Sequence, residues 1–310
     1  MNTSILSARG LTKQYGPTVA LAGVDLDILP GESVAIMGAS GSGKTTLMHA
    51  LAGIVTPDTG SIAFSTPTGV VRVDQLDERH RSQLRRESFG FVFQQGLLIP
   101  ELTAVENVAI ALMLGGTPRI AAETSAAAWL AALGLAGMET RRIGELSGGQ
   151  AQRVAIARAQ VTGAPIVFAD EPTGALDSRT SADVMGALLH ATTGQGRTLV
   201  LVTHDETVAA RCSRTIRLAD GRIVGQPGGV GAPTPPQQVA TGQAPVPQQV
   251  QPPFPPQQLP YQQQHAGQPF PQQPYAQPAA QPYPQPAAQP YPPQAHPGQA
   301  TGVVPNGARP

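Results

Sequence analysis

A glycine-rich segment at residues 38–46, GASGSGKTT, constrains the fold more than any other part of the chain. It follows an apolar strand pattern at 34–37 and leads into a helical pattern at 47–52, which is the context that a phosphate-binding loop requires. Glycines in such a loop let successive backbone N–H groups turn toward phosphate oxygens, and the helix that follows presents the positive end of its dipole to them. The segment therefore predicts a nucleoside triphosphate site on a strand–loop–helix unit.

Two side chains of this loop have separate expected roles. Lys44 is expected to reach the β- and γ-phosphates, and Thr45 to place its hydroxyl on Mg²⁺. The rest of the loop is expected to hold the phosphates, and its residues are Gly38, Ala39, Ser40, Gly41, Ser42, Gly43 and Thr46. Kinases, GTPases and many ATPases share a loop of this kind, so other residues must choose among these classes.

A second glycine pair lies in the sequence LSGGQ at 146–150, just before a helical run that continues to Arg158. Here the chain resembles the ABC-type ATPases, whose signature sequence this is. The resemblance implies a homodimer in which the signature of one copy closes over ATP held by the other, through Ser147, Gly148, Gly149 and Gln150. An ordinary helix N-cap is the alternative, because Ser before a helical run is the usual cap.

Two apolar runs, at 165–169 and 198–202, lead into polar residues. The first is typical of a buried parallel strand whose carboxyl end meets a ligand crevice. By resemblance to the family, Asp170 is the second Mg²⁺-holding residue and Glu171 is the carboxylate that polarises the attacking water. His204 matches the family's switch histidine, which contacts the γ-phosphate and holds the water in line.

Three further positions match the family. Gln94 matches the glutamine that reports Mg²⁺ and nucleotide to a membrane partner, which makes it both a metal ligand and a catalytic residue. Asp177 lies in the segment that communicates across the dimer, and Tyr15 occupies the place of the aromatic that stacks on adenine. One aromatic near an N-terminal strand is more often a packing residue, so that alternative stays open for Tyr15. The resemblance covers about residues 5 to 225.

The expected fold is α/β, with a P-loop NTPase core of mostly parallel sheet, an antiparallel β lobe and a helical subdomain. One ATPase domain is expected at 1–225, with the helical subdomain at about 96–160. Strands at 4–11 and 21–29 would build the lobe, and Asp220-Gly221 predicts a hairpin turn. The helical pattern predicts further helices at 105–114, 121–133, after the signature, and at 181–191.

From about residue 226 the chain consists largely of Pro, Gln, Ala and Gly, and Arg309 is the only charged residue after Arg222. Three octapeptides with tyrosine at a fixed position follow one another at 273–280, 281–288 and 289–296. Such a composition cannot bury a core and favours extended polyproline II segments, so 226–310 is predicted to be a disordered tail. Multivalent docking onto a protein partner and a dispensable extension are both open for it.

Composition narrows the function classes. The chain has 20 Lys and Arg against 20 Asp and Glu, which argues against nucleic-acid binding. Its one cysteine, Cys212, excludes an internal disulfide and suits a reducing compartment. Neither a leader nor an apolar run of about eighteen residues is visible, so any membrane part is expected on another chain. We therefore expect a peripheral protein at the cytoplasmic face of the cell membrane.

Within the family, residues 91–108 resemble the branch that serves macrolide and lipoprotein exporters and the cell-division ATPase. The expected function is an ATP-hydrolysing subunit that drives a separately encoded permease, by export or by transmitting force. The alternatives are a regulatory ATPase whose permease controls an extracytoplasmic enzyme, and a soluble ABC protein without a transport role. Departures from the family are small: Ala151 replaces a common Gln, and Gln160 replaces a common Leu, where a buried polar side chain is expected to weaken packing.

Overall fold

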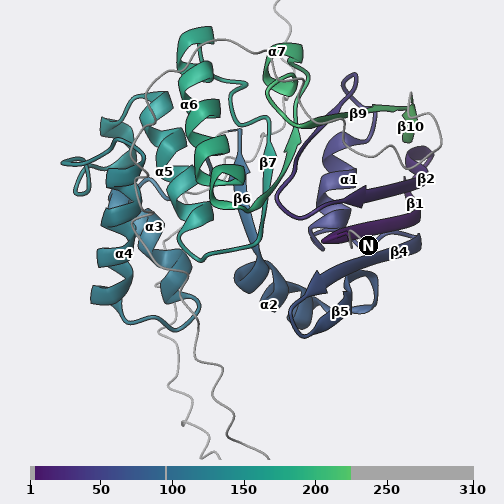
Figure 1. Cartoon of the computed structure of the whole chain (residues 1–310), viewed down its shortest axis with the longest axis horizontal. Coiled ribbons are helices and arrows are strands. Elements are labelled where there is room, and N and C mark those ends of the chain that lie inside the picture. The colour runs from purple at the N-terminus through teal and green to yellow at the C-terminus, as the bar shows by residue number, and fades with distance from the viewer. Residues whose placement is uncertain (1–3, 95, 225–310) are drawn as a thin grey trace, which may run out of the picture. The chain divides into compact units, whose positions relative to one another are not determined.

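The computed structural model describes residues 4–94 and 96–224 (Figure 1). Within them, a six-stranded sheet runs in the order β10-β9-β3-β8-β7-β6, and every neighbouring pair is parallel except β9–β10. Its strands are β3 (Ser33–Met37), β6 (Phe89–Phe93), β7 (Ile166–Asp170), β8 (Thr198–Val202), β9 (Arg214–Ala219) and β10 (Arg222–Val224). This mostly parallel sheet confirms the predicted core.

The central strands are apolar throughout because both faces of the sheet are covered. All five residues of β3 are buried. Val34 and Ile36 belong to one core cluster, with α1 (Lys44–Leu51) and the second sheet, whereas Ala35 and Met37 belong to the other, with the larger helices. Successive side chains of a strand point to opposite faces, so one short run supplies both cores.

A second sheet, the antiparallel β lobe, has the order β2-β1-β4-β5 within the described residues. It consists of β1 (Leu6–Tyr15), β2 (Thr18–Ile28), β4 (Thr59–Thr66) and β5 (Gly69–Arg72). The lobe was predicted, but β1 continues to Tyr15 and β2 begins at Thr18. The pairing of β1 with β2 shifts register around Gly10, which has φ 58°, and then continues along the polar end of β1. The predicted strands were too short because this polar end has no strand pattern in the sequence.

The larger helices gather on the other side of the parallel sheet, beside β6 and β7 in Figure 1. They are α3 (Ala104–Met113), α4 (Arg119–Ala132), α5 (Gly148–Gln160) and α6 (Ser178–Ala191). Each of the helices predicted at 105–114, 121–133 and 181–191 is present, starting one to three residues earlier than expected. The short α7 (Glu206–Ala209) follows β8. The predicted turn joins β9 to β10, with Asp220 at φ 47° and Gly221 at φ 71°.

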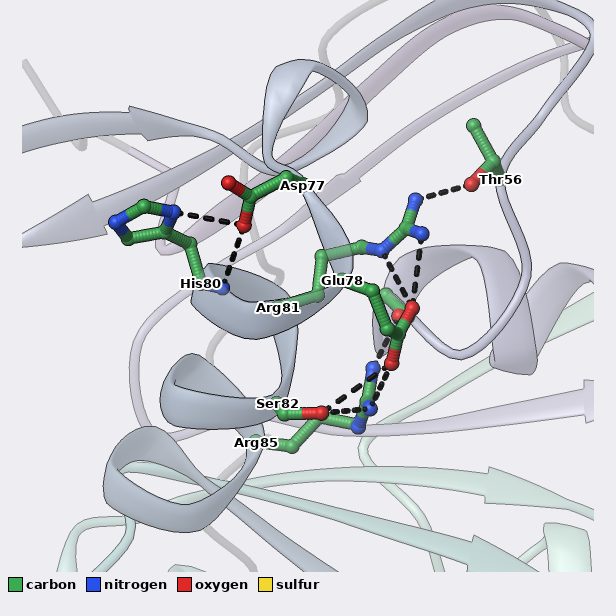
Figure 2. Close-up of polar contacts among 8 residues, drawn as sticks. Thr56, Asp77, Glu78, His80, Arg81, Ser82 and Arg85 are labelled. Atoms are coloured by element: carbon green, nitrogen blue, oxygen red, sulfur yellow. Dashed lines mark hydrogen bonds and ion pairs between the residues drawn. The ribbon is translucent and has the colours of Figure 1, made fainter. Parts of the chain in front are cut away.

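Helix α2 (Glu78–Ser88) was not predicted, and it has no buried residue. Leu84 packs against the core from this helix, and polar contacts hold its first turns and connect it to neighbouring segments (Figure 2). Asp77 caps it by accepting from the His80 N–H, and Glu78 accepts from Arg81 and Arg85. Arg85 also donates to the Gly53 carbonyl at 2.6 Å, which ties α2 to the end of α1. These arginines lower the pKa of Glu78 to about 2.

Gln160, at the end of α5, is fully buried, which is the case in which its polar side chain is expected to weaken packing. Its side-chain oxygen accepts a hydrogen bond from Arg197, just before β8, while its Nε2 finds no partner among the described residues. The Arg197 guanidinium lies 5.5 Å from the centre of the Trp129 ring on α4. One arginine therefore joins two helices to the start of a core strand.

No helix of residues 4–94 and 96–224 is long and apolar enough to cross a membrane. The predicted tail, with its octapeptide repeats, lies outside the described residues.

Candidate functional site: a phosphate-binding cavity

The loop between β3 and α1 is shaped by close backbone contacts. A Cβ built on Gly38 would lie 2.1 Å from the Leu218 carbonyl oxygen, and one on Gly43 would lie 2.1 Å from that of Ala20. Gly43 also has φ 100°, where side chains are rarely tolerated. It is the residue from which α1 starts, and no side chain caps the helix there. The glycines are thus required by packing and by backbone conformation together.

The side chain of Lys44 curls back over this loop. Its Nζ donates to the carbonyl oxygens of Gly38 at 2.9 Å and Ala39 at 2.8 Å, and the residue is only 9% exposed. A cation fixed there, beside the N-terminus of α1, makes the loop attractive to an anion.

The carboxyl end of β7 brings two acidic side chains to the loop. Asp170 accepts from the Thr45 hydroxyl, with Oγ1 3.3 Å from Oδ2. Burial raises the pKa of Asp170, and the neighbouring charge of Glu171 raises it further, while Thr45 acts in the opposite direction. Burial also lowers the pKa of His49 on α1, which the sequence did not single out, and Asp170 counteracts that shift.

Glu171 and His204 form a pair at the ends of adjacent strands. His204 Nδ1 lies 2.8 Å from Glu171 Oε1, with the Glu171 side chain 18% exposed and the His204 side chain 70% exposed. Glu171 has φ 46°, which is unusual for a side-chain-bearing residue. Its N–H donates to the Val202 carbonyl at 2.9 Å, which holds this conformation in place. Strain kept at one carboxylate is typical of a functional position.

A cavity of about 600 Å³ lies beside the loop, and Asp170 is not among the residues that line it. Its lining includes Glu171, Val202, His204, Thr18, Ala20 and most of the loop, namely Gly38, Ala39, Ser40, Gly41, Gly43, Lys44, Thr45 and Thr46. Sequence reasoning missed Thr18 and Ala20, because small residues on an antiparallel strand carry no signal of their own.

Tyr15 and Gln94 lie near this cavity without forming its walls. Tyr15 pairs with Thr18 across the β1–β2 hairpin, is 49% exposed, and lies 5.5 Å from the Lys13 ammonium. Gln94 follows β6, and a Cβ on Gly174 would come within 2.9 Å of its Nε2. The amide of Gln94 therefore lies against the loop that follows Glu171. Stacking of Tyr15 on adenine remains a prediction.

The signature residues lie at the start of α5 and do not line the cavity. Ser147 accepts from the Gln150 N–H at 3.3 Å, and the Gln150 side chain accepts from the Ser147 N–H at 2.9 Å. This is a capping box, so the alternative of an ordinary N-cap is correct as a description of the local structure. Both glycines approach neighbouring segments: a Cβ on Gly149 would lie 2.4 Å from Thr180 Cγ2, and one on Gly148 3.2 Å from a methyl of Leu176.

Asp177 caps α6, accepting from the N–H groups of Arg179 at 3.1 Å and Thr180 at 3.0 Å. The hydrogen bond of the Thr180 side chain, together with these backbone hydrogen bonds, lowers the pKa of Asp177. The structure thus gives this residue a local role, whereas its predicted role in dimer communication stays a prediction.

Comparison with known proteins places the chain in one family. A protein-family model described as ABC transporter matches residues 21–174. The chain is 48% identical over 229 residues to a pyoverdine export ATP-binding/permease protein, PvdT, of Pseudomonas fluorescens. It is 46% identical, again over 229 residues, to a macrolide export ATP-binding/permease protein, MacB, of Rhodopseudomonas palustris. Each match covers 72% of this chain but 34% of the relative, so the chain spans about a third of the length of these proteins.

Solved structures give a match at full domain length. The dimeric structure of MJ0796, titled a bacterial ABC transporter cassette, is 38% identical with a TM-score of 0.64, and the match covers 71% of this chain and 96% of that one. A second structure, with the same values, is titled a post-hydrolysis dimer of this ATP-binding cassette bound to ADP and Pi. The chain therefore belongs to the ATP-binding family of ABC transporters, and its described residues form an ABC ATPase domain.

Proposed function

We propose that this ATPase is the subunit that powers an ABC exporter, binding ATP between two copies of itself and driving a permease on a separate chain. The Glu171–His204 pair carries this proposal, since it lies in the same cavity as Lys44 and the phosphate-binding loop. A carboxylate and an imidazole at hydrogen-bonding distance, both beside an anion site, suit the activation of a water molecule.

ATP would bind with its β- and γ-phosphates over the loop and α1. Lys44 would exchange its two carbonyl contacts for phosphate oxygens, and the backbone N–H groups at residues 38–46 would surround the phosphates. Tyr15 would stack on the adenine. The position of Tyr15 beside the cavity-lining Thr18 supports this, as does the half-exposed ring.

Mg²⁺ fits the oxygen donors beside the loop. Thr45 and Asp170 would hold it, with Gln94 as a further ligand, and their oxygens suit an ion that proteins usually bind through one or two carboxylates together with substrate phosphates. When bound, Mg²⁺ supplies charge neutralisation at the transferred phosphoryl group. Asp170 is partly buried, and a carboxylate in such a position attracts a cation more strongly than one in bulk water.

Hydrolysis requires an attacking water in line with the bond to the γ-phosphate. Glu171 would accept a hydrogen bond from that water and take its proton as the new P–O bond forms, while ADP leaves on the opposite side. His204 would hold the water and contact the γ-phosphate. The 2.8 Å contact between them keeps the carboxylate and the imidazole oriented together.

The second half of each site would come from another copy. Ser147, Gly148, Gly149 and Gln150 start a helix whose N-terminus attracts anions, yet none of them lines the cavity of their own chain. A two-fold dimer would bring each signature over its partner's ATP, with Asp177 near the dimer contact. The dimeric cassettes to which this chain is similar support that arrangement.

The permease would dock on the helical side of the domain. Apolar side chains are exposed between β6 and α3 and around the turn from α3 to α4, namely Leu97, Ile99, Met113, Leu114 and Ile120. Apolar groups exposed close together in sequence, as at the turn from α3 to α4, favour a protein interface. The names of the relatives, which combine ATP-binding and permease functions for pyoverdine and macrolide export, support a permease partner. The ATPase would lie at the cytoplasmic face of the membrane.

The first experiment uses Glu171→Gln, with Glu87→Gln, an exposed carboxylate on α2, as the matched control. Glu171→Gln is expected to lose roughly a hundredfold or more in turnover while still binding ATP and accumulating as an ATP-bound dimer. Glu87→Gln is expected to behave as the natural protein does. Near-normal turnover of Glu171→Gln would overturn the assignment of the base.

The second experiment is a pull-down of Glu171→Gln from detergent-solubilised membranes with ATP present. A permease recovered on its own polypeptide supports the transporter proposal, and its extracytoplasmic part distinguishes an exporter from a regulatory coupler. Recovery of soluble partners alone would contradict the proposal and favour a non-transport role.

A further inference from the structure

The backbone on either side of Gln94 is held by side chains from α5. Gln152 Nε2 donates to the Phe93 carbonyl at 3.0 Å, and that carbonyl also accepts from the Gly96 N–H at 2.8 Å. Arg158 donates through both terminal nitrogens, to the carbonyls of Gly96 and Leu97, each at 2.7 Å. Three backbone carbonyls close to Gln94 therefore accept hydrogen bonds from side chains of one helix.

Forming the Arg158 contact costs desolvation free energy. Arg158 is half-buried, and this burial lowers its pKa, while no carboxylate pairs with it among the described residues. Desolvating a cation without a counter-charge is costly, so the arrangement persists only if the two carbonyls replace its hydration. The planar fork of an arginine can bond two carbonyls at once, whereas a lysine presents a single point charge. Leu97, at φ 46°, adopts an uncommon backbone conformation where its carbonyl meets this fork.

Further along the same segment, a second buried side chain performs a similar task. Asn107 on α3 is fully buried; its Oδ1 accepts from the Ile99 N–H at 2.7 Å, and its Nδ2 donates to the Ile99 carbonyl at 3.0 Å. The backbone that leaves β6 is thus hydrogen-bonded to two helices, α5 and α3. It does not rely on the sheet alone for its position.

We propose that Arg158 and Gln152 are positioning residues that fix the segment carrying Gln94 to the signature helix. Because α5 begins beside Ser147, one helix then sets the position of Gln94 in its own ATP site and of Ser147 in the partner's site. A shift of α5 would therefore move Gln94 and Ser147 together. This inference rests on the proposed function, and it adds two residues whose effect passes through Gln94.

The test compares Arg158→Lys with Arg153→Lys. Arg153 lies on the same helix, but its guanidinium donates to the Leu133 carbonyl at 3.4 Å, away from Gln94. Arg158→Lys is expected to lower kcat roughly tenfold and to raise the Mg²⁺ concentration at half-maximal rate several-fold, with ATP affinity in the absence of Mg²⁺ unchanged. Arg153→Lys is expected to leave all three values as in the natural protein.

Binding measured without turnover separates positioning from loss of folded protein. In the Glu171→Gln background, Mg²⁺ should increase ATP affinity less when Arg158→Lys is added. A merely structural role would lower the melting temperature and the active fraction with the Mg²⁺ dependence unchanged, and that result would overturn the proposal. If Arg158→Lys does not fold, Gln152→Met removes one donor and leaves Phe93 its bond from Gly96, and the same shift is expected.

A double-mutant cycle tests whether the effect passes through Gln94. Added to Gln94→Ala, Arg158→Lys should lower kcat no further, because the side chain that it positions is absent. If kcat of the double variant falls by the product of the two single-variant factors, the inference is contradicted. An inactive natural protein would contradict the proposed function itself, whereas an active protein with no change in Mg²⁺ dependence would contradict only this inference.

Discussion

Helices α1 and α5 both start at glycine-rich segments, yet their first turns are built in opposite ways. Gly43, which precedes α1, offers no side-chain cap, and the helix opens into the cavity beside Lys44. Ser147 and Gln150 close the start of α5 with a reciprocal pair of hydrogen bonds. Most other helices in the described residues resemble α5, because Asp77, Thr103, Asp177 and Asp205 cap α2, α3, α6 and α7.

The difference indicates which of the two starts depends on a ligand. A helix without a cap leaves N–H groups unsatisfied, and at α1 these donors are available to phosphates. The start of α5 has its cap without a ligand, which suits a surface that would bind a second copy of the chain. The two glycines are also required by different neighbours. A Cβ at Gly43 would clash with a backbone atom of β2, whereas a Cβ at Gly149 would clash with a side chain of α6.

The largest expected effect is that of Gly43→Ala. The new methyl group would meet the Ala20 carbonyl oxygen at 2.1 Å, and the backbone, at φ 100°, cannot relax without opening the loop. We expect a loss of about 3 kcal/mol or more in the free energy of unfolding, from overpacking and backbone strain together. Urea unfolding followed by circular dichroism measures it. A loss under about 1 kcal/mol would mean that the loop is not rigidly packed against β2.

Gly149→Ala should cost less, because its obstacle is a side chain. The added methyl group would lie 2.4 Å from Thr180 Cγ2, and we expect a loss of about 1–3 kcal/mol. Thr180→Ser removes that methyl group and keeps the hydroxyl, so the double variant should recover most of the loss. If Thr180→Ser gives no rescue in the same unfolding measurement, contact with α6 is not the reason for glycine at this position.

Ser147→Ala and Gln150→Ala separate the cap from the proposed phosphate contact. Each removes one half of the capping box, and each should cost about 1 kcal/mol in the free energy of unfolding. Ser147→Ala should nevertheless reduce ATP turnover more, because the proposed contact with the partner's nucleotide is also lost. Equal turnover in two equally destabilised variants would leave Ser147 with the role of a cap alone.

The smallest expected effect concerns the charged start of α2, and it depends on pH. Arg85 and Arg81 hold the pKa of Glu78 at about 2, below the ordinary value of 4.5, so Glu78 stabilises the fold above about pH 4.5 and loses this contribution as pH falls toward 2. Glu78→Gln should therefore lower the melting temperature slightly at pH 7, and the difference should shrink at pH 3. The uncharged box at α5 should show no such dependence; a constant difference for Glu78→Gln would refute the assignment.

Sequence reasoning succeeded where chemistry or packing imposes a pattern. The loop around Lys44 was visible because phosphate binding needs glycines and a lysine at fixed spacing, and β7 and β8 were visible because strands buried on both faces are continuously apolar. Predicted helices began late because a cap such as Thr103 or Asp177 has no apolar periodicity.

Other parts of the fold left no readable pattern. Helix α2 has no fully buried residue, so its charged sequence lacks an apolar face, and the contact of Leu84 with the core together with those of Arg81 and Arg85 accounts for it. The role of Arg158 was equally hidden, since an arginine near the end of a helix usually faces water. The proposed dimer half of the site cannot be read from one chain, because Ser147 would contribute to the ATP site of a second copy.

The contact between Arg197 and Trp129 has an optical consequence. Trp129 is the only tryptophan of the chain, and it lies on α4 at 5.5 Å from a guanidinium that is bonded to the end of α5 and adjoins β8. Its emission senses the charge and polarity of that one junction. The natural protein thus contains a fluorescent reporter where its helices meet the start of β8, and a movement that changes the contact between Arg197 and Trp129 can be followed without a label.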